Sequence, residues 1–374
     1  MTKYITGALA ALGLAASSTV VTAVGTPPAP GAVYTATNGA ATNEILVYDR
    51  AGNGQLTHMA TVATGGAGTG SGLGNQGGLR ITADGRFLLV VNAGSHDVSV
   101  LRVTPHGLEV TDRVGSGGFR PVSVAVSGRL VYVLNAGGSV GDADNISGFR
   151  LSRFGQLTPI AGSTRPLSAA STAPAQVEFS PDGSLLVVTE KATNAIDVFP
   201  VNDTGVAGAG TFYPSNAPTP FGFSFGQRGQ LFVSEAWGGA PDASSVSSYE
   251  LSDMAQLVTI DPAVPDTETA ACWLVVTASG RYLYVTNTGS STISGYEIQT
   301  DGTIALLDAD GATAPTGPGS APIDLAFSVD DQYLYALSGG ANTITIFRRL
   351  PQGGLQPGGS VSGLPAGTNG LAAR

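Results

Sequence analysis

The sequence predicts an all-β fold, a seven-bladed β-propeller with four-stranded antiparallel blades, from two observations. First, a short apolar strand, a Gly-containing turn and a second apolar strand that ends in Asn, Glu or Ser recur along the chain. Second, one copy of this unit is split between the two ends of the chain. A chain that completes its first unit with its last residues closes a ring, and four-stranded units of roughly 40 to 50 residues are typical of propeller blades.

The repeat can be followed in order along the chain. Six copies are complete, and they occupy residues 78–92, 122–135, 175–190, 221–235, 273–287 and 323–338. For the seventh copy, residues 369–373 supply the first strand and residues 32–38 the second. Alternating apolar residues within the copies indicate strands, and Asp-Gly and Ser-Gly pairs between them indicate tight turns. A β-helix or two sandwiches are the alternatives, but neither explains the split copy.

The residues before the repeat have the pattern of an export signal. Lys3 provides positive charge, residues 5–16 are apolar, and small residues surround Ala23. This apolar segment is too short for a typical membrane span. We therefore expect a signal peptide over residues 1–23, a leader over 24–31 and one propeller domain over 32–374, in a secreted or periplasmic protein. The alternative is an apolar tail that is not a signal.

Composition restricts the partners. The formal net charge is −10 and the pI is about 4.6, without a run of Lys or Arg, so we expect no binding to nucleic acid and no membrane insertion. The single cysteine, Cys272, forms no intramolecular disulfide and is interpreted as a packed thiol. Asp142, Asp144 and Asn145 lack the closing Glu of a calcium loop and are interpreted as a solvated acidic loop. We expect no cofactor, no bound metal and a monomer.

Propeller geometry gathers polar residues at one face. The first strand of a blade is innermost and the second runs back, so the ends of the second strands and the starts of the first strands share this face, the mouth. The strand-end residues are Asn38, Asn92, Asn135, Glu190, Glu235, Asn287 and Ser338. The residues near the starts of the first strands are Asn75, Gln76, Arg120, Gln176, Phe221, Trp273 and Asp324.

Ligand sites tend to occupy such a polar mouth, which also carries the long loops 137–145 and 237–245. The alternative is that each Asn simply bonds to its own turn. The residues that we predict to bind a ligand are Gln76, Asn92, Arg120, Asn135, Gln176, Trp273 and Asn287. His96 lies in a loop on the same face, and a lone loop histidine is usually solvated.

Two segments carry a resemblance to a known family. Residues 179–183 read Phe-Ser-Pro-Asp-Gly before an apolar strand, and residues 280–287 contain the Tyr-Val-Thr-Asn tetrapeptide of extracellular propeller repeats. With the repeat over residues 32–374, the chain resembles the seven-bladed lactonase family, which includes 6-phosphogluconolactonases and carboxymuconate lactonizing enzymes. The resemblance implies the propeller fold and, for active members, chemistry on lactones.

The chain departs from the family at most catalytic positions. Where family enzymes usually have His-Pro-His-Gln, residues 173–176 read Ala-Pro-Ala-Gln. An Arg-His pair that follows a Pro in the family is replaced by Phe221 and Gly222, and a further arginine is replaced near Thr269. Only Glu235 matches the family pattern, and Glu190 has the same position in the neighbouring blade.

Two hypotheses from different classes follow. Because the imidazoles are missing, we favour a binding module that holds a small molecule, a glycan or a peptide in the mouth around Arg120, Gln176 and Trp273. The alternative is a divergent lactone hydrolase or cycloisomerase with Glu235, alone or with Glu190, as acid and base. A structural surface protein that uses the rim for adhesion is a third possibility. Whether the chain is an enzyme is left open.

Overall fold

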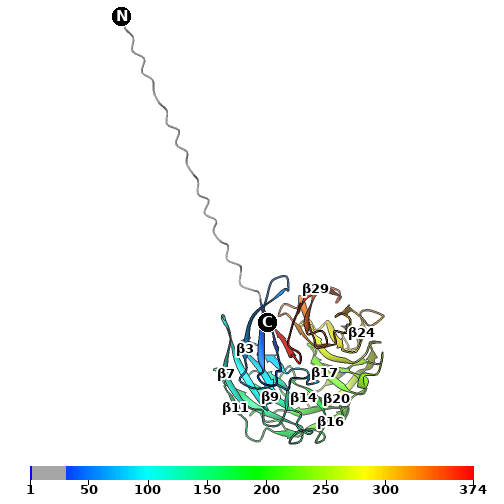
Figure 1. Ribbon diagram of the computed structural model, residues 1–374. Helices are drawn as coiled ribbons and strands as arrows, with labels where there is room; N and C mark the ends of the chain where they lie inside the picture. The colour runs from blue at the N-terminus through cyan, green and yellow to red at the C-terminus, as the bar shows by residue number, and fades with distance from the viewer. Residues whose placement is uncertain (2–30) are drawn as a thin grey trace.

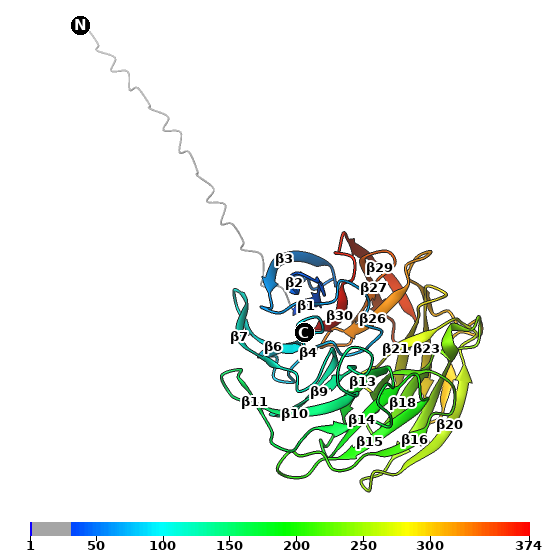
Figure 2. The same cartoon turned by 60° about the horizontal axis from the view of Figure 1, so that its bottom comes forward.

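The computed structural model describes Met1 and residues 31–374, and residues 31–374 form a ring of seven antiparallel sheets around a central axis (Figures 1 and 2). The predicted seven-bladed propeller is confirmed. The predicted signal peptide and leader fall almost entirely on residues 2–30, outside the described part of the chain, and stay predictions. Within the described part, no helix has the length and apolar character needed to cross a membrane.

The strands of the first three blades follow the predicted order. Blade 1 contains β30 (Asn369–Ala373), β1 (Gly31–Ala36), β2 (Glu44–Arg50) and β3 (Leu56–Ala63). Blade 2 contains β4 (Leu79–Ile81), β5 (Phe87–Asn92), β6 (Asp97–Thr104) and β7 (Gly107–Gly115). Blade 3 contains β8 (Pro121–Ser127), β9 (Leu130–Asn135), β10 (Asn145–Leu151) and the outer pieces β11 (Leu157–Pro159) and β12 (Arg165–Pro166).

The remaining four blades repeat this arrangement. Blade 4 contains β13 (Pro174–Phe179), β14 (Leu185–Glu190), β15 (Ala195–Pro200) and β16 (Thr211–Pro214). Blade 5 contains β17 (Pro220–Phe225), β18 (Gln230–Glu235), the 3-10 turn η1 (Trp237–Gly239), β19 (Ser245–Leu251) and β20 (Leu257–Pro265). Blade 6 contains β21 (Ala271–Val276), β22 (Tyr282–Asn287), β23 (Thr292–Ile298), β24 (Ile304–Leu306) and β25 (Ala314–Pro315). Blade 7 contains β26 (Pro322–Phe327), β27 (Tyr333–Ser338), β28 (Thr343–Arg349) and β29 (Leu355–Ser362).

The ring closes through the C-terminal strand. β30 pairs antiparallel with β1, and Figure 2 shows the two strands side by side although they come from opposite ends of the chain. The Thr35 hydroxyl donates a hydrogen bond of 2.7 Å to the Gly370 carbonyl across this pair. The split blade predicted from the sequence is confirmed, and noncovalent contacts alone join the two ends in the described residues.

The core lies between the blades. Every residue of β5, β14, β18, β22 and β27 is buried, because a second strand is covered by its neighbours and by the adjoining blades. Leu89 and Val91 of blade 2, for example, pack in one apolar cluster with Val131 and Val133 of blade 3. This packing fixes the rotation of each blade and hence the position of the loops at the mouth.

Candidate functional site

The strand-end asparagines join the second and third strands within a blade. Asn92 donates to Asp97 Oδ1 at 2.6 Å and to Ser99 Oγ at 2.8 Å, both on the third strand of its own blade. Asn287 donates to Ser294 Oγ at 2.8 Å in the same way, and Asn135 donates to Asn145 Oδ1 at 3.1 Å. All three strand-end side chains are completely buried. The structure therefore places them inside the blades, and their predicted ligand-binding role stays a prediction.

Glu235 is also buried inside its blade. Its carboxylate accepts hydrogen bonds from Ser245 Oγ and Ser247 Oγ, both at 2.7 Å, and from Ser215 Oγ and the Ala217 backbone N–H, both at 3.1 Å. Burial raises the pKa of the Glu235 carboxyl, and the serine hydroxyls partly oppose this shift. Four donors thus join the second and third strands of blade 5 to the segment that leaves blade 4.

Glu190 has a different neighbour in blade 4. It accepts hydrogen bonds from the Ser168 N–H at 2.9 Å and from the hydroxyls of Ser168 and Thr193. Asp197 lies beside it, fully buried, and burial together with the Glu190 carboxylate raises the pKa of Asp197 to about 10. Asp197 therefore holds a proton at neutral pH, beside the Glu190 carboxylate. The acid and base roles of Glu190 and Glu235 stay predictions.

Three other predicted residues bridge blades near the ring axis. Gln76 donates to the Leu274 carbonyl at 2.8 Å and accepts from the Leu274 N–H at 3.1 Å, as a neighbouring strand would. Gln176 pairs with Phe223 in the same manner, at 3.0 and 2.8 Å. The Trp273 indole N–H donates to the Asn75 carbonyl at 2.7 Å. These buried side chains replace hydrogen bonds that the innermost strands lack.

In blades 3 to 7 the mouth has a repeated backbone bond beside the first strand. The residue before the strand has a positive φ, between 47° and 63°, and its carbonyl accepts a hydrogen bond from the residue after the second strand. The acceptors in blades 3 to 7 are Arg120, Ala173, Thr219, Ala270 and Ala321, and their donors are Ala136, Lys191, Ala236, Thr288 and Gly339. Because the bond uses backbone atoms only, it does not itself require a particular side chain at these ten positions.

Arg120 and Lys191 are the exceptions within this set. The other eight described positions carry Ala, Gly or Thr, whereas these two carry long cationic side chains in neighbouring blades. Arg120 has a φ of 52°, which is unfavourable for a residue with a Cβ. Both residues have long charged side chains where the equivalent positions have small ones, and this difference marks their part of the mouth as a candidate ligand site.

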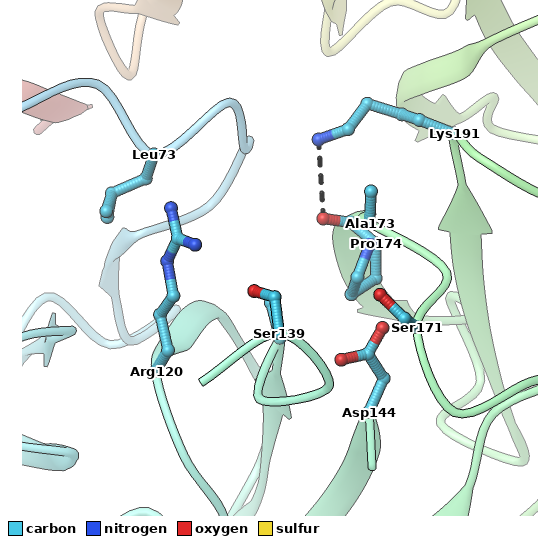
Figure 3. Close-up of a pocket in the computed structure, with 9 residues that line it drawn as sticks. Leu73, Arg120, Ser139, Asp144, Ser171, Ala173, Pro174 and Lys191 are labelled. Atoms are coloured by element: carbon cyan, nitrogen blue, oxygen red, sulfur yellow. Dashed lines mark hydrogen bonds between the residues drawn. The ribbon is translucent and has the colours of Figure 1, made fainter. Parts of the chain in front are cut away.

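Both side chains project into one pocket (Figure 3). The cavity has a volume of about 260 Å³ and opens to solvent on the mouth face. Its walls are formed by Leu73, Arg120, Ala136, Ser139, Asp144, Ser171, Ala173, Pro174 and Lys191. In Figure 3 the Arg120 guanidinium and the Lys191 amine approach the opening from opposite walls.

The two cations are held differently. Lys191 Nζ donates to the carbonyls of Gly74 and Pro174 and lies 4.7 Å from the centre of the Phe221 ring. Burial lowers the pKa of Lys191 to about 8. Arg120 Nε is buried and has no hydrogen-bond partner within residues 31–374, while the Arg120 backbone N–H donates to His96 Nδ1 at 3.1 Å. Arg120 therefore retains a buried donor that a ligand can satisfy.

Asp144 lines the pocket and fixes two of the segments that form it. Its carboxylate accepts hydrogen bonds from the Gly138 N–H at 2.8 Å and from the N–H and hydroxyl of Thr172 at 2.6 and 3.0 Å. These three bonds fasten the loop that carries Ser139 to the segment that carries Ser171. Asp144 is buried, so it is not the solvated residue predicted from the sequence. The reason is the Thr172 segment, which covers it from blade 4.

Sequence reasoning anticipated Arg120 but missed Lys191. Glu190, next to Lys191, drew attention as the strand-end residue, although its side chain turns into the blade. A usable signal was present in the repeat itself. Aligning the residue that follows each second strand gives Ala136, Lys191, Ala236, Thr288 and Gly339, and the lysine stands out in that alignment.

Comparison with known proteins agrees with the fold. The family model described as "Lactonase, 7-bladed beta-propeller" matches residues 32–165 and 242–363, and leaves out the segment that contains Lys191 and Glu235. The periplasmic gluconolactonase PpgL of Pseudomonas aeruginosa is similar, with 19% identity, a TM-score of 0.74, and coverage of 92% of this chain and 98% of that chain.

A putative 6-phosphogluconolactonase from Bacteroides fragilis has 18% identity and a TM-score of 0.71, and covers 92% of this chain and 98% of its own. A putative 6-phosphogluconolactonase from Bacteroides uniformis has 20% identity, a TM-score of 0.71 and coverage of 92% and 99%. Comparison with curated proteins gave no match. At these identities the structural likeness supports the fold alone.

Proposed function

The chain belongs to the seven-bladed β-propeller lactonase family, and from this premise we propose that it binds a small sugar-derived ligand, an aldonate anion or its lactone, between Arg120 and Lys191. The observation that carries this proposal is the pair of cations in a set of mouth positions that otherwise hold small side chains. Similar structures include a gluconolactonase and putative 6-phosphogluconolactonases, which suggests the sugar class.

The chemistry of the pocket suits such a ligand. A guanidinium presents parallel N–H donors that match a carboxylate or phosphate, whereas an ammonium acts as a point charge. The hydroxyls of Ser139 and Ser171 line the same cavity and can bond to sugar hydroxyls. A cavity of about 260 Å³ fits a ligand of one sugar unit better than a polymer.

Binding can be tested with variants that the repeat itself supplies. Arg120→Ala and Lys191→Ala place at each position the residue found there in other blades, Ala173 and Ala236, so the fold should tolerate both. We expect each variant to weaken gluconate or 6-phosphogluconate binding about tenfold or more, as loss of a charged hydrogen bond does. Titration calorimetry measures this. Unchanged affinity in both variants would refute the proposal, and Ala321→Ser in distant blade 7 serves as the control.

Lactone hydrolysis is a second candidate, favoured by the lowered pKa of Lys191. An amine with a pKa of about 8 is partly neutral near neutral pH and can accept a proton from water. The water oxygen then bonds to the lactone carbonyl carbon, Arg120 stabilises the oxyanion, and the ring C–O bond breaks. The protonated amine returns its proton to the leaving ring oxygen.

Turnover of gluconolactone as a function of pH tests this candidate. We expect kcat to rise through a pH of about 8 and to disappear in Lys191→Ala, with Glu235→Gln as the comparison. If Glu235 is instead the acid or base, Glu235→Gln loses turnover while Lys191→Ala keeps it. An absence of turnover by the unchanged chain leaves binding as the function.

A further inference from the structure

The face opposite the mouth carries a groove between blades 2 and 3. It is formed by the turn that joins β4 to β5, the turn that joins β8 to β9 and the turn after β10, and its volume is about 210 Å³. The lining residues are Thr82, Ala83, Asp84, Arg86, Phe87, Val126, Gly128, Arg129, Leu151, Ser152 and Arg153. We refer to it as the 2/3 groove.

The 2/3 groove is strongly basic. Arg86, Arg129 and Arg153 line it, and Asp84 is the one acidic residue among its lining residues, 3.8 Å from Arg86 Nη1. The Arg129 side chain makes no hydrogen bond or ion pair within the described residues. The arginines are far apart in the sequence, so no run of basic residues indicated the cluster that the fold assembles.

The fold does not require this charge, because an equivalent groove lies between blades 4 and 5. That 4/5 groove has about the same volume, 210 Å³, and contains Asp182, Arg228 and Asp253. The turn after β10 reads Leu-Ser-Arg-Phe-Gly-Gln-Leu at 151–157, and the turn after β19 reads Leu-Ser-Asp-Met-Ala-Gln-Leu at 251–257. Arg153 thus occupies the position that Asp253 has in the 4/5 groove.

The two turns share the same backbone bonds. The Ser152 N–H donates to the Gln156 carbonyl at 2.8 Å, and the Ser252 N–H donates to the Gln256 carbonyl at 2.9 Å. Each serine hydroxyl in turn accepts the N–H of its glutamine, at 3.1 and 3.2 Å. Because the backbone is the same, the choice between Arg153 and Asp253 is a choice of charge alone.

An exposed aromatic ring accompanies the arginines. Phe154 is 55% exposed, and the Arg153 guanidinium lies 4.6 Å from the centre of its ring. An aromatic face next to a guanidinium suits a ligand that has both an apolar face and an anionic group. A hexuronate unit has both, since its ring C–H groups form an apolar face and its carboxylate matches the guanidinium.

A second basic groove lies on the same face, between blades 6 and 7. It has a volume of about 450 Å³ and is lined by Arg281, Arg348 and Arg349 among others. Glu297 pairs with Arg281 at 3.1 Å, whereas the Arg348 side chain makes no hydrogen bond or ion pair among residues 31–374. Two basic grooves on one face favour a ligand that repeats its charge, because a polymer can occupy both.

We propose that the face opposite the mouth is a docking surface for an acidic polysaccharide, whose uronate carboxylates bind Arg86, Arg129 and Arg153 in the 2/3 groove. The groove between blades 6 and 7 is the second contact for the same polymer. The positive side chains that line both grooves are arginines, which suits bidentate recognition of carboxylates.

Affinity electrophoresis through gels that contain polygalacturonate tests the proposal. We expect the unchanged chain to be retarded at low salt, to be released as salt rises, and to pass unhindered through neutral dextran. Arg153→Asp, which reproduces the turn of blade 5, should weaken retardation about tenfold or more, and so should Arg129→Ala. Arg228→Ala in the 4/5 groove is the matched control and should change nothing.

Four outcomes would overturn the proposal. They are an absence of retardation, retardation that survives both Arg153→Asp and Arg129→Ala, an equal loss in Arg228→Ala, and equal retardation by single-stranded DNA. A melting temperature that matches the unchanged chain shows that Arg153→Asp is folded. The double variant Arg120→Ala, Lys191→Ala should still bind polygalacturonate, so a failure of the mouth proposal and a failure of this one are distinguishable.

Discussion

Asp197 departs from the residue type that most blades have at its position. The equivalent third-strand positions in blades 2, 3, 5, 6 and 7 are Ser99, Ser147, Ser247, Ser294 and Thr345, all of them hydroxyl residues. In blades 2 and 6 the hydroxyl accepts a hydrogen bond from the strand-end asparagine, and in blade 5 it donates to Glu235. Blade 4 instead holds the neighbouring carboxyl groups of Asp197 and Glu190, an arrangement that depends on pH.

Asp197→Ser should make the stability of the protein less dependent on pH. The pKa of Asp197 is about 10 in the folded state and about 3.9 when unfolded, so the folded state holds the proton more tightly. Its contribution is present below a pH of about 4 and is lost as pH rises toward about 10. Urea unfolding at pH 5, 7 and 9 should show that the free energy of unfolding of the variant rises relative to that of the unchanged chain at each step. The relative rise should be up to about 1.4 kcal/mol per pH unit.

A matched variant separates this effect from lost packing. Ser294→Ala removes a polar group at the same register of blade 6 but removes no ionisable group. It should lower the free energy of unfolding by a similar amount at all three pH values. Parallel pH dependence of Asp197→Ser and the unchanged chain would show that the pKa of Asp197 is not raised in the folded state.

At the residue level, the sequence predicted the place of a residue along its strand better than the direction in which its side chain points. It placed Asn92, Glu190 and Glu235 correctly at the ends of second strands. It did not reveal that these side chains turn into the blade, because their partners, such as Ser168 and Ser215, lie in connectors whose paths no periodicity predicts. The pocket depends on a similar path, since Leu73 reaches it from the long loop before β4.

At the scale of elements, tight turns lock neighbouring blades together. The turn between β28 and β29 places Gly353 against blade 6, where its carbonyl accepts a 2.6 Å hydrogen bond from the Tyr284 hydroxyl. Tyr335 donates to the Gly54 carbonyl of blade 1 in the same way, at 3.1 Å. Gly353 has a φ of +87°, and a Cβ there would lie 2.7 Å from the Tyr282 ring.

Gly353→Ala should therefore destabilise the protein by more than backbone strain alone. A left-handed residue with a Cβ costs about 1 to 2 kcal/mol, and the contact with Tyr282 adds about 1 kcal/mol or more. Gly229→Ala is the control, because Gly229 has a similar φ of +81° and open space around it. Chemical denaturation should give a larger loss for Gly353→Ala, and equal losses would mean that the contact relaxes freely.

At the scale of the molecule, β30 joins the two ends of the ring. Besides pairing with β1, it brings the Leu371 N–H within 2.9 Å of Asp324 Oδ2 in blade 7 and the Asn369 amide within 3.0 Å of Asn75 Oδ1 in blade 2. This closure was predictable, because a two-residue alternation and a missing first strand are both visible in the sequence.

Removal of residues 369–374 should open the ring. β1 then loses its inner partner, and Asp324 and Asn75 lose the groups that satisfy them. We expect a fall of several kcal/mol in the free energy of unfolding, or aggregation through the exposed strand edge. Thermal unfolding and gel filtration measure these effects, and Thr35→Val, which removes one bond of the β1–β30 pair, should cost about 1 kcal/mol. An unaltered truncated chain would contradict the closure.

The repeated backbone bond at the mouth makes the location of the chemistry independent of the architecture. Since the carbonyl before the first strand and the N–H after the second strand carry the bond in blades 3 to 7, an arginine at 173 and a lysine at 236 would meet the same backbone one blade further on. Ala173→Arg and Ala236→Lys, made where Arg120 and Lys191 have become alanine, would rotate the charge pair by one seventh of a turn. Blades 3 to 7 thus provide equivalent backbone positions at which substitution of two residues can create, move or duplicate a pair of ligand-binding charges.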